Sequence, residues 1–291
     1  MKIKYTLAFL LLVLPAFISN AFADPVNEYD KSGRITKTTY DDGSYDMYSY
    51  FYYGDGYKYT YNAAGQRTGD YYYPNATAFT NNAPTSKQEY TYDENGNQTS
   101  VTSYYSAASI ANNAPNYKTE WTYDGNGNTT SETYYNSAEE IANDAPNCKT
   151  EWTYDGNGNQ TSETYYNSAE EIANNAPNYK TEWTYDENGN KTSYTYYDSA
   201  DAIANNAPDY KEAYQYNAEQ NTYLTMYYNS AESVANNTPD TRHVSWEDDD
   251  GWYDAAYDKN GRLLLDSWDD VIIRDNQGRI IRSGASVCRP M

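Results

Sequence analysis

The stretch Tyr117-Lys118-Thr119-Glu120-Trp121-Thr122-Tyr123-Asp124-Gly125-Asn126-Gly127-Asn128 returns every 31 residues. It recurs almost unchanged from Cys148 and from Tyr179, and weaker copies start at Ser86, at Tyr210 and near Asp55. A fixed period of this length indicates one supersecondary unit stacked on copies of itself. Stacked units build long surfaces, and such surfaces bind partners more often than they catalyse reactions.

Each copy begins with a pattern that is typical of a β-hairpin. Aromatic residues and threonines alternate with polar residues from Tyr117 to Tyr123, which predicts a strand with one aromatic and one polar face. The dipeptide Asn126-Gly127 predicts a two-residue type I′ turn, in which both residues adopt positive φ. A second strand follows through Thr129 to Tyr135. This turn pairs Tyr123 with Thr130, Trp121 with Glu132 and Thr119 with Tyr134.

A short helix is expected after each hairpin. Ser137-Ala138-Glu139-Glu140 has the form of a capping box, and Ala138, Ile141, Ala142 and Ala145 share one helical face. Pro146 is expected to end the helix. Two turns of helix cannot stand alone, so we expect the helix over residues 137–144 to lie on the aromatic face of the sheet. The fold class is an α+β repeat protein, in which tandem 31-residue hairpin-helix units form a long twisted antiparallel sheet.

The repeats are expected to be flanked by a signal peptide and two caps. Lys2 and Lys4 precede an apolar run, and Ala21-Phe22-Ala23 resembles a cleavage site, so residues 1–23 indicate a secretory signal peptide. We expect an N-terminal hairpin cap over 24–54, six tandem repeats over 55–240 and a C-terminal hairpin cap over 241–291. With no further apolar stretch of transmembrane length, the protein is expected to be secreted to the extracellular space, the cell surface or a periplasm.

The composition is acidic and rich in tyrosine. The chain has 42 Asp and Glu against 20 Lys and Arg, for a net charge of −22, and loss of the signal peptide with its two lysines would make this −24. Such a charge repels nucleic acid, so no nucleic-acid partner is expected. There are 38 tyrosines, which suit a thin, half-exposed sheet because each ring can be buried while its hydroxyl stays hydrated.

The sequence does not predict a catalytic or metal site. The single histidine, His243, lacks a Ser or Cys nucleophile in a recognisable context, so we expect no enzymatic activity and no catalytic residues. The Asp-x-Asn-Gly-Asn turns that begin at Asp93, Asp124, Asp155 and Asp186 resemble fragments of calcium loops. They lack the acidic ligand that an EF-hand needs further along the chain, so they are expected to be plain turns without a metal or cofactor.

Two rows of aromatic residues are candidates for ligand binding. The first occupies one equivalent position in successive repeats: Tyr90, Trp121, Trp152, Trp183 and Tyr214. The second lies at the end of the second strand: Tyr104, Tyr135, Tyr166, Tyr197 and Tyr228. If the helices cover the tryptophan row, the tyrosine row on the polar face is left to bind ligand. The five tyrosines of the second row are therefore the predicted ligand-binding residues.

Short motifs resemble the tyrosine-aspartate (YD) repeat of Rhs-type secreted bacterial proteins. Tyr29 and Tyr257 each begin a Tyr-Asp-x-x-Gly-Arg sequence followed by Ile or Leu, and the inner copies resemble its Tyr-x-Tyr-Asp-x-Asn-Gly-Asn-x-Thr form, as at Tyr90 to Thr99. The resemblance implies an exported, cell-surface β-repeat protein that binds carbohydrate. This chain differs in its length and in the helix expected in each unit, so encapsulation is not expected.

We therefore expect an exported, non-catalytic binding module for a polysaccharide or a surface glycan. The alternative is a structural spacer, or a surface repeat protein that binds another protein and has no small-molecule ligand.

Overall fold

The computed structural model describes residues 25–51, 54–217, 222–248, 251–266, 270–274 and 280–285, with side chains described up to residue 245 and again at residues 255–264. The predicted signal peptide lies outside the described residues.

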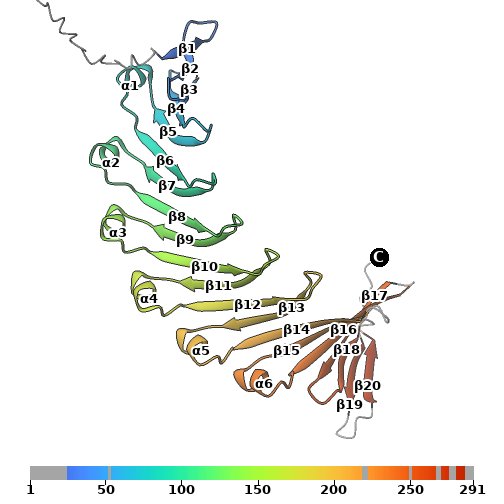
Figure 1. The fold of residues 1–291 in the computed structure, drawn as a ribbon. Helices are drawn as coiled ribbons and strands as arrows, with labels where there is room; N and C mark the ends of the chain where they lie inside the picture. Colours follow the sequence, from blue (N-terminus) through green and yellow to red (C-terminus); the bar gives the residue numbers. More distant parts are fainter. Residues whose placement is uncertain are drawn as a thin grey trace, which may run out of the picture.

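The structure is one open antiparallel sheet in which each strand pairs with the next strand along the chain. Figure 1 shows these strands following one another in a curved array. The first strands are β1 (Val26–Tyr29), β2 (Ile35–Thr39), β3 (Tyr45–Tyr50), β4 (Gly56–Tyr61), β5 (Arg67–Tyr73), β6 (Ser86–Tyr92), β7 (Gln98–Tyr104), β8 (Tyr117–Tyr123) and β9 (Thr129–Tyr135). They continue with β10 (Cys148–Tyr154), β11 (Gln160–Tyr166), β12 (Tyr179–Tyr185), β13 (Lys191–Tyr197), β14 (Tyr210–Asn217), β15 (Thr222–Tyr228), β16 (Thr241–Asp248), β17 (Gly251–Asp258) and β18 (Leu263–Asp266). Strands β19 (Asp270–Arg274) and β20 (Ile280–Ala285) form a separate hairpin.

Six hairpins of this sheet are each followed by a short helix. The helices of the described residues are α1 (Ala76–Thr80), α2 (Ala107–Ala111), α3 (Ala138–Asn143), α4 (Ala169–Asn174), α5 (Ala200–Ala204) and α6 (Ala231–Ala235). All six lie along the same side of the array, opposite the hairpin turns (Figure 1). The predicted fold class is confirmed.

The hairpin register is close to the prediction, and the turn differs from it. Trp121 lies opposite Glu132 and Thr119 opposite Tyr134, as expected, but Tyr123 lies opposite Thr129 because the register shifts after Thr122. Of Asn126 and Gly127, only the glycine has a positive φ, of 86°. The turn is therefore a bulged turn with one left-handed residue, and the predicted type I′ turn is wrong.

Aspartate stabilises this longer turn. Asp124 accepts hydrogen bonds at Oδ1 from the backbone N–H groups of Asn126 and Asn128, both at 2.9 Å, and at Oδ2 from the Asn128 side chain. A two-residue turn leaves no room for such a bridge, so the Asp-x-Asn-Gly-Asn pattern encodes the bulged turn. The same bonds recur at Asp93, Asp155 and Asp186. They lower the pKa of these carboxyl groups, with the Asn side-chain bond as the largest cause.

Each helix begins at a serine or asparagine cap and has a left-handed residue at its C-cap or one position later. Ser137 caps α3 by accepting a hydrogen bond from the backbone of Glu140. The Glu140 carboxylate accepts from the N–H of Asn136, one residue before the position that a capping box uses. The helix ends at Asp144, which has a φ of 51°, and Pro146 is buried two residues later. Asn or Asp fills this position in every repeat because these residues tolerate left-handed geometry best after glycine.

The helices cover the polar face of the sheet, and the prediction that they cover the tryptophan face is wrong. Tyr135 pairs with Lys118, so these two residues share a face, while Trp121 lies on the other face with Glu132. Tyr135 is 5% exposed, whereas the Trp121 side chain is only half-buried. A six-residue helix is about 9 Å long, so it can cover one ring per repeat, and the tryptophan face carries several.

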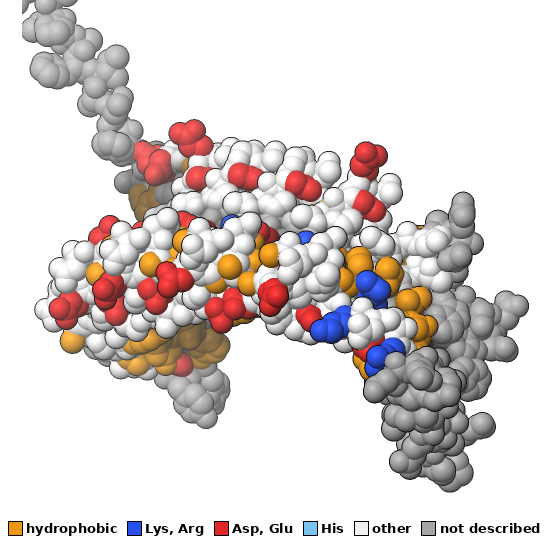
Figure 2. All heavy atoms as spheres, turned by 90° about the horizontal axis from the view of Figure 1, so that it is seen from below, with side chains coloured by type: hydrophobic (Ala, Val, Ile, Leu, Met, Phe, Trp, Pro, Cys, Tyr) orange, Lys and Arg blue, Asp and Glu red, His pale blue; other side chains and the backbone are white. Residues whose placement is uncertain are grey.

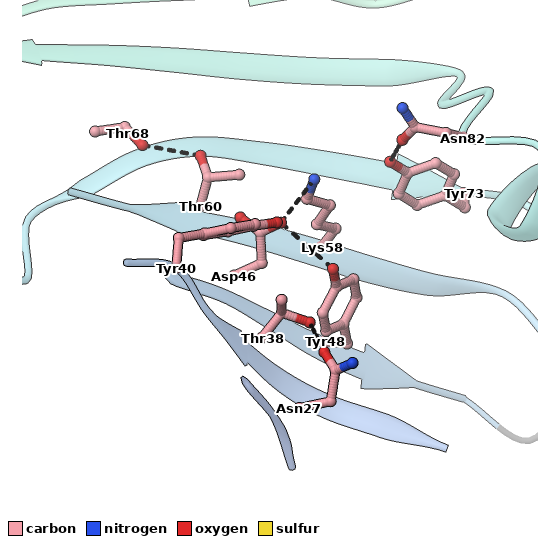
Figure 3. Close-up of polar contacts among 10 residues, drawn as sticks. All are labelled: Asn27, Thr38, Tyr40, Asp46, Tyr48, Lys58, Thr60, Thr68, Tyr73 and Asn82. Atoms are coloured by element: carbon pink, nitrogen blue, oxygen red, sulfur yellow. Dashed lines mark hydrogen bonds and ion pairs between the residues drawn. The ribbon is translucent and has the colours of Figure 1, made fainter. Parts of the chain in front are cut away.

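The N-terminal hairpins contain a buried charge. The Asp46 carboxylate is 5% exposed and accepts hydrogen bonds from the hydroxyls of Tyr40 at 2.8 Å and Tyr48 at 3.3 Å, and it pairs with Lys58 at 2.9 Å (Figure 3). A buried carboxylate with this many partners is a structural ion pair. We infer that Asp46 and its three partners stabilise this end of the sheet.

Candidate binding face

The five tyrosines predicted to bind ligand form the core under the helices. Their side chains are 3–5% exposed: Tyr104, Tyr135, Tyr166, Tyr197 and Tyr228. The prediction that this row faces solvent is wrong. The physical reason is that a single residue separates the end of the second strand from the helix cap, as Asn136 does between Tyr135 and Ser137, so the returning chain folds over the ring.

Each of these rings is held by the residue that ends the helix. The Tyr104 hydroxyl donates to Asn113 Oδ1 at 3.0 Å and the Tyr135 hydroxyl to Asp144 Oδ1 at 2.9 Å, nine residues further along the chain. The same bond joins Tyr73 to Asn82 (Figure 3), Tyr166 to Asn175, Tyr197 to Asn206 and Tyr228 to Asn237. Burial, followed by the charge of Glu182, raises the pKa of Tyr197 to about 12. The buried hydroxyls are thus satisfied donors and not free ligand contacts.

The opposite face of the sheet carries the other aromatic row and, among the described residues, no helix; we call it the open face. Its central row is Tyr90, Trp121, Trp152, Trp183 and Tyr214, and all five side chains are half-buried. The neighbouring strand contributes further rings, since Tyr134 lies opposite Thr119 on this face and Tyr196 lies opposite Thr181. The result is a continuous strip of partly exposed rings across the repeats.

Tyrosine hydroxyls fix this strip from one repeat to the next. The Tyr123 hydroxyl donates to the backbone carbonyl of Gln98 at 2.7 Å, in the preceding hairpin. Tyr92, Tyr154 and Tyr185 make the same bond to Arg67, Thr129 and Gln160. Because each bond spans 25 residues and crosses a repeat boundary, these bonds fix the position of the aromatic strip across neighbouring repeats.

Carboxylates lie between the rings of the open face. Glu163 accepts hydrogen bonds from Trp152 Nε1 at 3.1 Å and from the Tyr179 hydroxyl at 2.9 Å. Burial, followed by this bond to Glu163, raises the pKa of Tyr179 to about 12. In the N-terminal repeats, Asp70 accepts from the Tyr90 hydroxyl at 2.8 Å. The face therefore combines flat rings with fixed hydrogen-bond acceptors.

The open face is hollowed between neighbouring repeats. A shallow hollow of about 390 Å³ lies between Trp121 and Trp152, and Glu132 and Tyr154 contribute to its lining. In the view of Figure 2, Asp and Glu side chains recur along the molecule. On the open face itself, Glu132 and Glu163 supply negative charge, which disfavours an anionic ligand there.

The described residues contain no metal cluster: no group of three or more His, Cys, Asp or Glu side chains among them is placed to hold a metal ion. His243 lies on β16 opposite Thr225, and its ring contacts the Tyr227 ring edge-on at 4.9 Å. No helix in the described part of the chain is long and apolar enough to cross a membrane.

Sequence reasoning identified both aromatic rows but interchanged the row that is buried under the helices and the row that is partly exposed. The sequence signal that could have shown which row is buried is the pair Asn112-Asn113 and its equivalents in the other repeats. A residue at positive φ, nine positions after a tyrosine, folds the helix end back over that ring.

No known protein family and no curated protein sequence matches the chain. The structure matches TcdB2-TccC3 with Cdc42 over 88% of its own length and 17% of that chain, at 12% identity and a TM-score of 0.23. The Photorhabdus luminescens Tc holotoxin pore matches over the same shares, at 12% identity and a TM-score of 0.22. A porin-like protein from Bacteroides uniformis matches over 82% of each chain, at 9% identity and a TM-score of 0.29. The toxin matches cover most of this chain at low identity, and this chain spans 17% of the length of each of those toxin chains.

Proposed function

We propose that the protein is an exported, non-catalytic binding module whose open face binds a neutral, extended polysaccharide. The observation that carries the proposal is the row of half-exposed rings Tyr90, Trp121, Trp152, Trp183 and Tyr214 on the face without helices. Flat rings stack on the apolar faces of sugar rings, and their large contact area gives affinity at little conformational cost. Export is supported by the N-terminal sequence.

The spacing of the row suits an extended polymer. Each repeat adds two strands, so equivalent rings in neighbouring repeats are about 9.6 Å apart. That distance is comparable to the length of two linked hexoses in an extended chain. A polymer of such units could place an equivalent sugar face over every repeat, and several weak contacts in register would add up to useful affinity.

The charges support a neutral ligand. Glu163 is fixed between Trp152 and Tyr179, and it could accept hydrogen bonds from sugar hydroxyls. The net charge of −22 would repel an anionic polysaccharide.

The test is affinity electrophoresis of the folded protein in gels that contain neutral β-glucans, mannans or galactans, with polygalacturonate as the anionic comparison. The test variant changes Trp121, Trp152 and Trp183 together to Ala. The control changes Thr122, Thr153 and Thr184 to Ala, because these exposed residues follow each tryptophan and face the helix side. Retardation by a neutral polysaccharide that is lost in the tryptophan variant and kept in the control is expected.

Retardation that persists in the tryptophan variant would contradict the proposal. If no neutral polysaccharide retards the native protein, the chain is better described as a structural spacer or a protein-interaction surface.

A further inference from the structure

We propose that the open face also contains a site, between β13 and β14, that binds an alkylammonium group and prefers a quaternary one; it shares only Tyr214 with the row proposed to bind polysaccharide. The site is a hollow of about 450 Å³ lined by Tyr194, Tyr196, Tyr210, Glu212 and Tyr214. The proposed ligand differs from a polysaccharide, and the proposal does not depend on polysaccharide binding.

The site lies where the repeat pattern changes. Earlier repeats have glutamate at Glu132 and Glu163, and the equivalent residue here is Tyr194. Earlier repeats have threonine at Thr150 and Thr181, and the equivalent residue here is Glu212. The carboxylate has thus moved by one strand, and an aromatic ring has taken its former position.

The changes surround Glu212 with tyrosines. Glu212 lies opposite Tyr194 of β13 on one side and opposite Tyr227 of β15 on the other. Along β14, the hydroxyl of Tyr210 donates to Glu212 at 2.5 Å, and that of Tyr214 donates to its other oxygen. A carboxylate ringed by aromatic side chains is suited to a cation, because both the charge and the ring faces attract it.

On the same face, lysine and arginine side chains of this chain already lie over aromatic rings. Lys191 Nζ lies 5.5 Å from the centre of the Trp183 ring, and the Arg67 guanidinium lies 4.2 Å from the centre of the Tyr59 ring. Tyr59 and Trp183 occupy the position that Tyr214 occupies in its own repeat. Lys211, the nearest cation along β14, points to the helix side and lies 6.0 Å from the Tyr228 ring. It does not compete for Glu212.

The hydrogen bonds at Glu212 favour a quaternary ammonium. Each carboxylate oxygen already accepts one tyrosine hydroxyl, so a primary amine can donate only to the one acceptor site that remains on each oxygen. A primary ammonium also loses strong hydration when it enters an aromatic site, whereas a methylated ammonium is weakly hydrated and loses less.

The test is an NMR titration of the folded protein with tetramethylammonium, with n-butylammonium as the analogue of a lysine side chain, and with 3,3-dimethylbutanol as a neutral molecule of similar shape. The variants are Glu212→Gln and, as the control in an unchanged repeat, Glu163→Gln. A third variant, Tyr194→Glu with Glu212→Thr, restores the residues of the earlier repeats and so is expected to fold.

Tetramethylammonium is expected to bind saturably and more tightly than n-butylammonium, and the neutral alcohol is expected not to bind. Glu212→Gln should weaken binding about tenfold, and Glu163→Gln should not. The pattern-restoring variant should lose ammonium binding and keep any polysaccharide binding. Equal binding of the neutral alcohol, or an unchanged affinity in Glu212→Gln, overturns the proposal. Tighter binding of n-butylammonium overturns the quaternary preference.

Discussion

Asn113 should stabilise the fold in two separable ways, through its left-handed backbone and through its hydrogen bond with Tyr104. Substitutions at this residue can measure both contributions. It adopts a φ of 47° at the end of α2, and its Oδ1 accepts the hydrogen bond from the buried Tyr104 hydroxyl at 3.0 Å. Asn113→Ala removes the bond, worth about 1 kcal/mol, and forces an alanine into left-handed geometry, which costs about 1–2 kcal/mol. Asn113→Gly removes the bond but relieves the backbone. Alanine should therefore destabilise the protein by about 2–3 kcal/mol, and glycine by about 1 kcal/mol less than alanine.

The neighbouring Asn112 provides the matched control. It is also exposed, but its φ is −90°, which alanine adopts readily. At Asn112 the order of stabilities should reverse, so that the Asn112→Gly variant is less stable than the Asn112→Ala variant. Urea-induced unfolding, followed by tryptophan fluorescence and by circular dichroism, measures each free energy.

A double-mutant cycle isolates the hydrogen bond. Tyr104→Phe alone should cost about 1 kcal/mol, and Asn113→Gly should cost about 1 kcal/mol less in the Tyr104→Phe variant than in the native protein. The reasoning is refuted if alanine is as stable as glycine at Asn113, or if the two substitutions are additive.

Three further predictions concern the turns and the N-terminal ion pair. Gly127→Ala should destabilise the protein by about 1–2 kcal/mol because its φ is 86°, whereas Gly125→Ala, where an added Cβ meets nothing within 4 Å, should be neutral or stabilising in the same urea assay. The pKa of Asp124 lies below its ordinary value of 3.8, so the ionised carboxylate stabilises the fold above that pH, and this contribution is lost as the pH falls through the lower pKa of the folded state. Asp124→Asn should therefore reduce the dependence of the free energy of unfolding on pH in this acid range. An unchanged pH profile argues against the turn hydrogen bonds. Lys58→Met should cost about 3 kcal/mol because it leaves the buried Asp46 charge unpaired, and Lys58→Met combined with Asp46→Asn should recover part of that loss in thermal unfolding.

Much of the fold could be predicted because the same sequence patterns for strand, turn and helix recur in successive repeats. Alternation along Thr119, Trp121 and Tyr123 predicts the strand, and the Asn-Gly pair predicts the hairpin and the opposition of Trp121 to Glu132. The turn type was missed because Asp124 bridges the loop from outside the two residues that the rule considers.

The faces could not be assigned from periodicity alone. Alternation shows that Trp121 and Tyr135 lie on opposite faces, but it does not show to which side the chain turns after Tyr135. That choice is made by Asp144 and its equivalents, whose left-handed backbone returns the chain over the tyrosine and whose side chain accepts its hydroxyl. The buried row and the partly exposed row were therefore interchanged, although the residue types of both rows were recognised.

The most direct test of the open face is hydroxyl-radical footprinting, read by mass spectrometry, with and without a neutral polysaccharide that binds in the gel assay. Trp121, Trp152 and Trp183 should be oxidised in the free protein and protected in the complex, while the buried Tyr135, Tyr166 and Tyr197 should stay largely unmodified in both. Unchanged tryptophan oxidation in the complex, or ligand-dependent protection of the buried tyrosines, would contradict the assignment of binding to the open face.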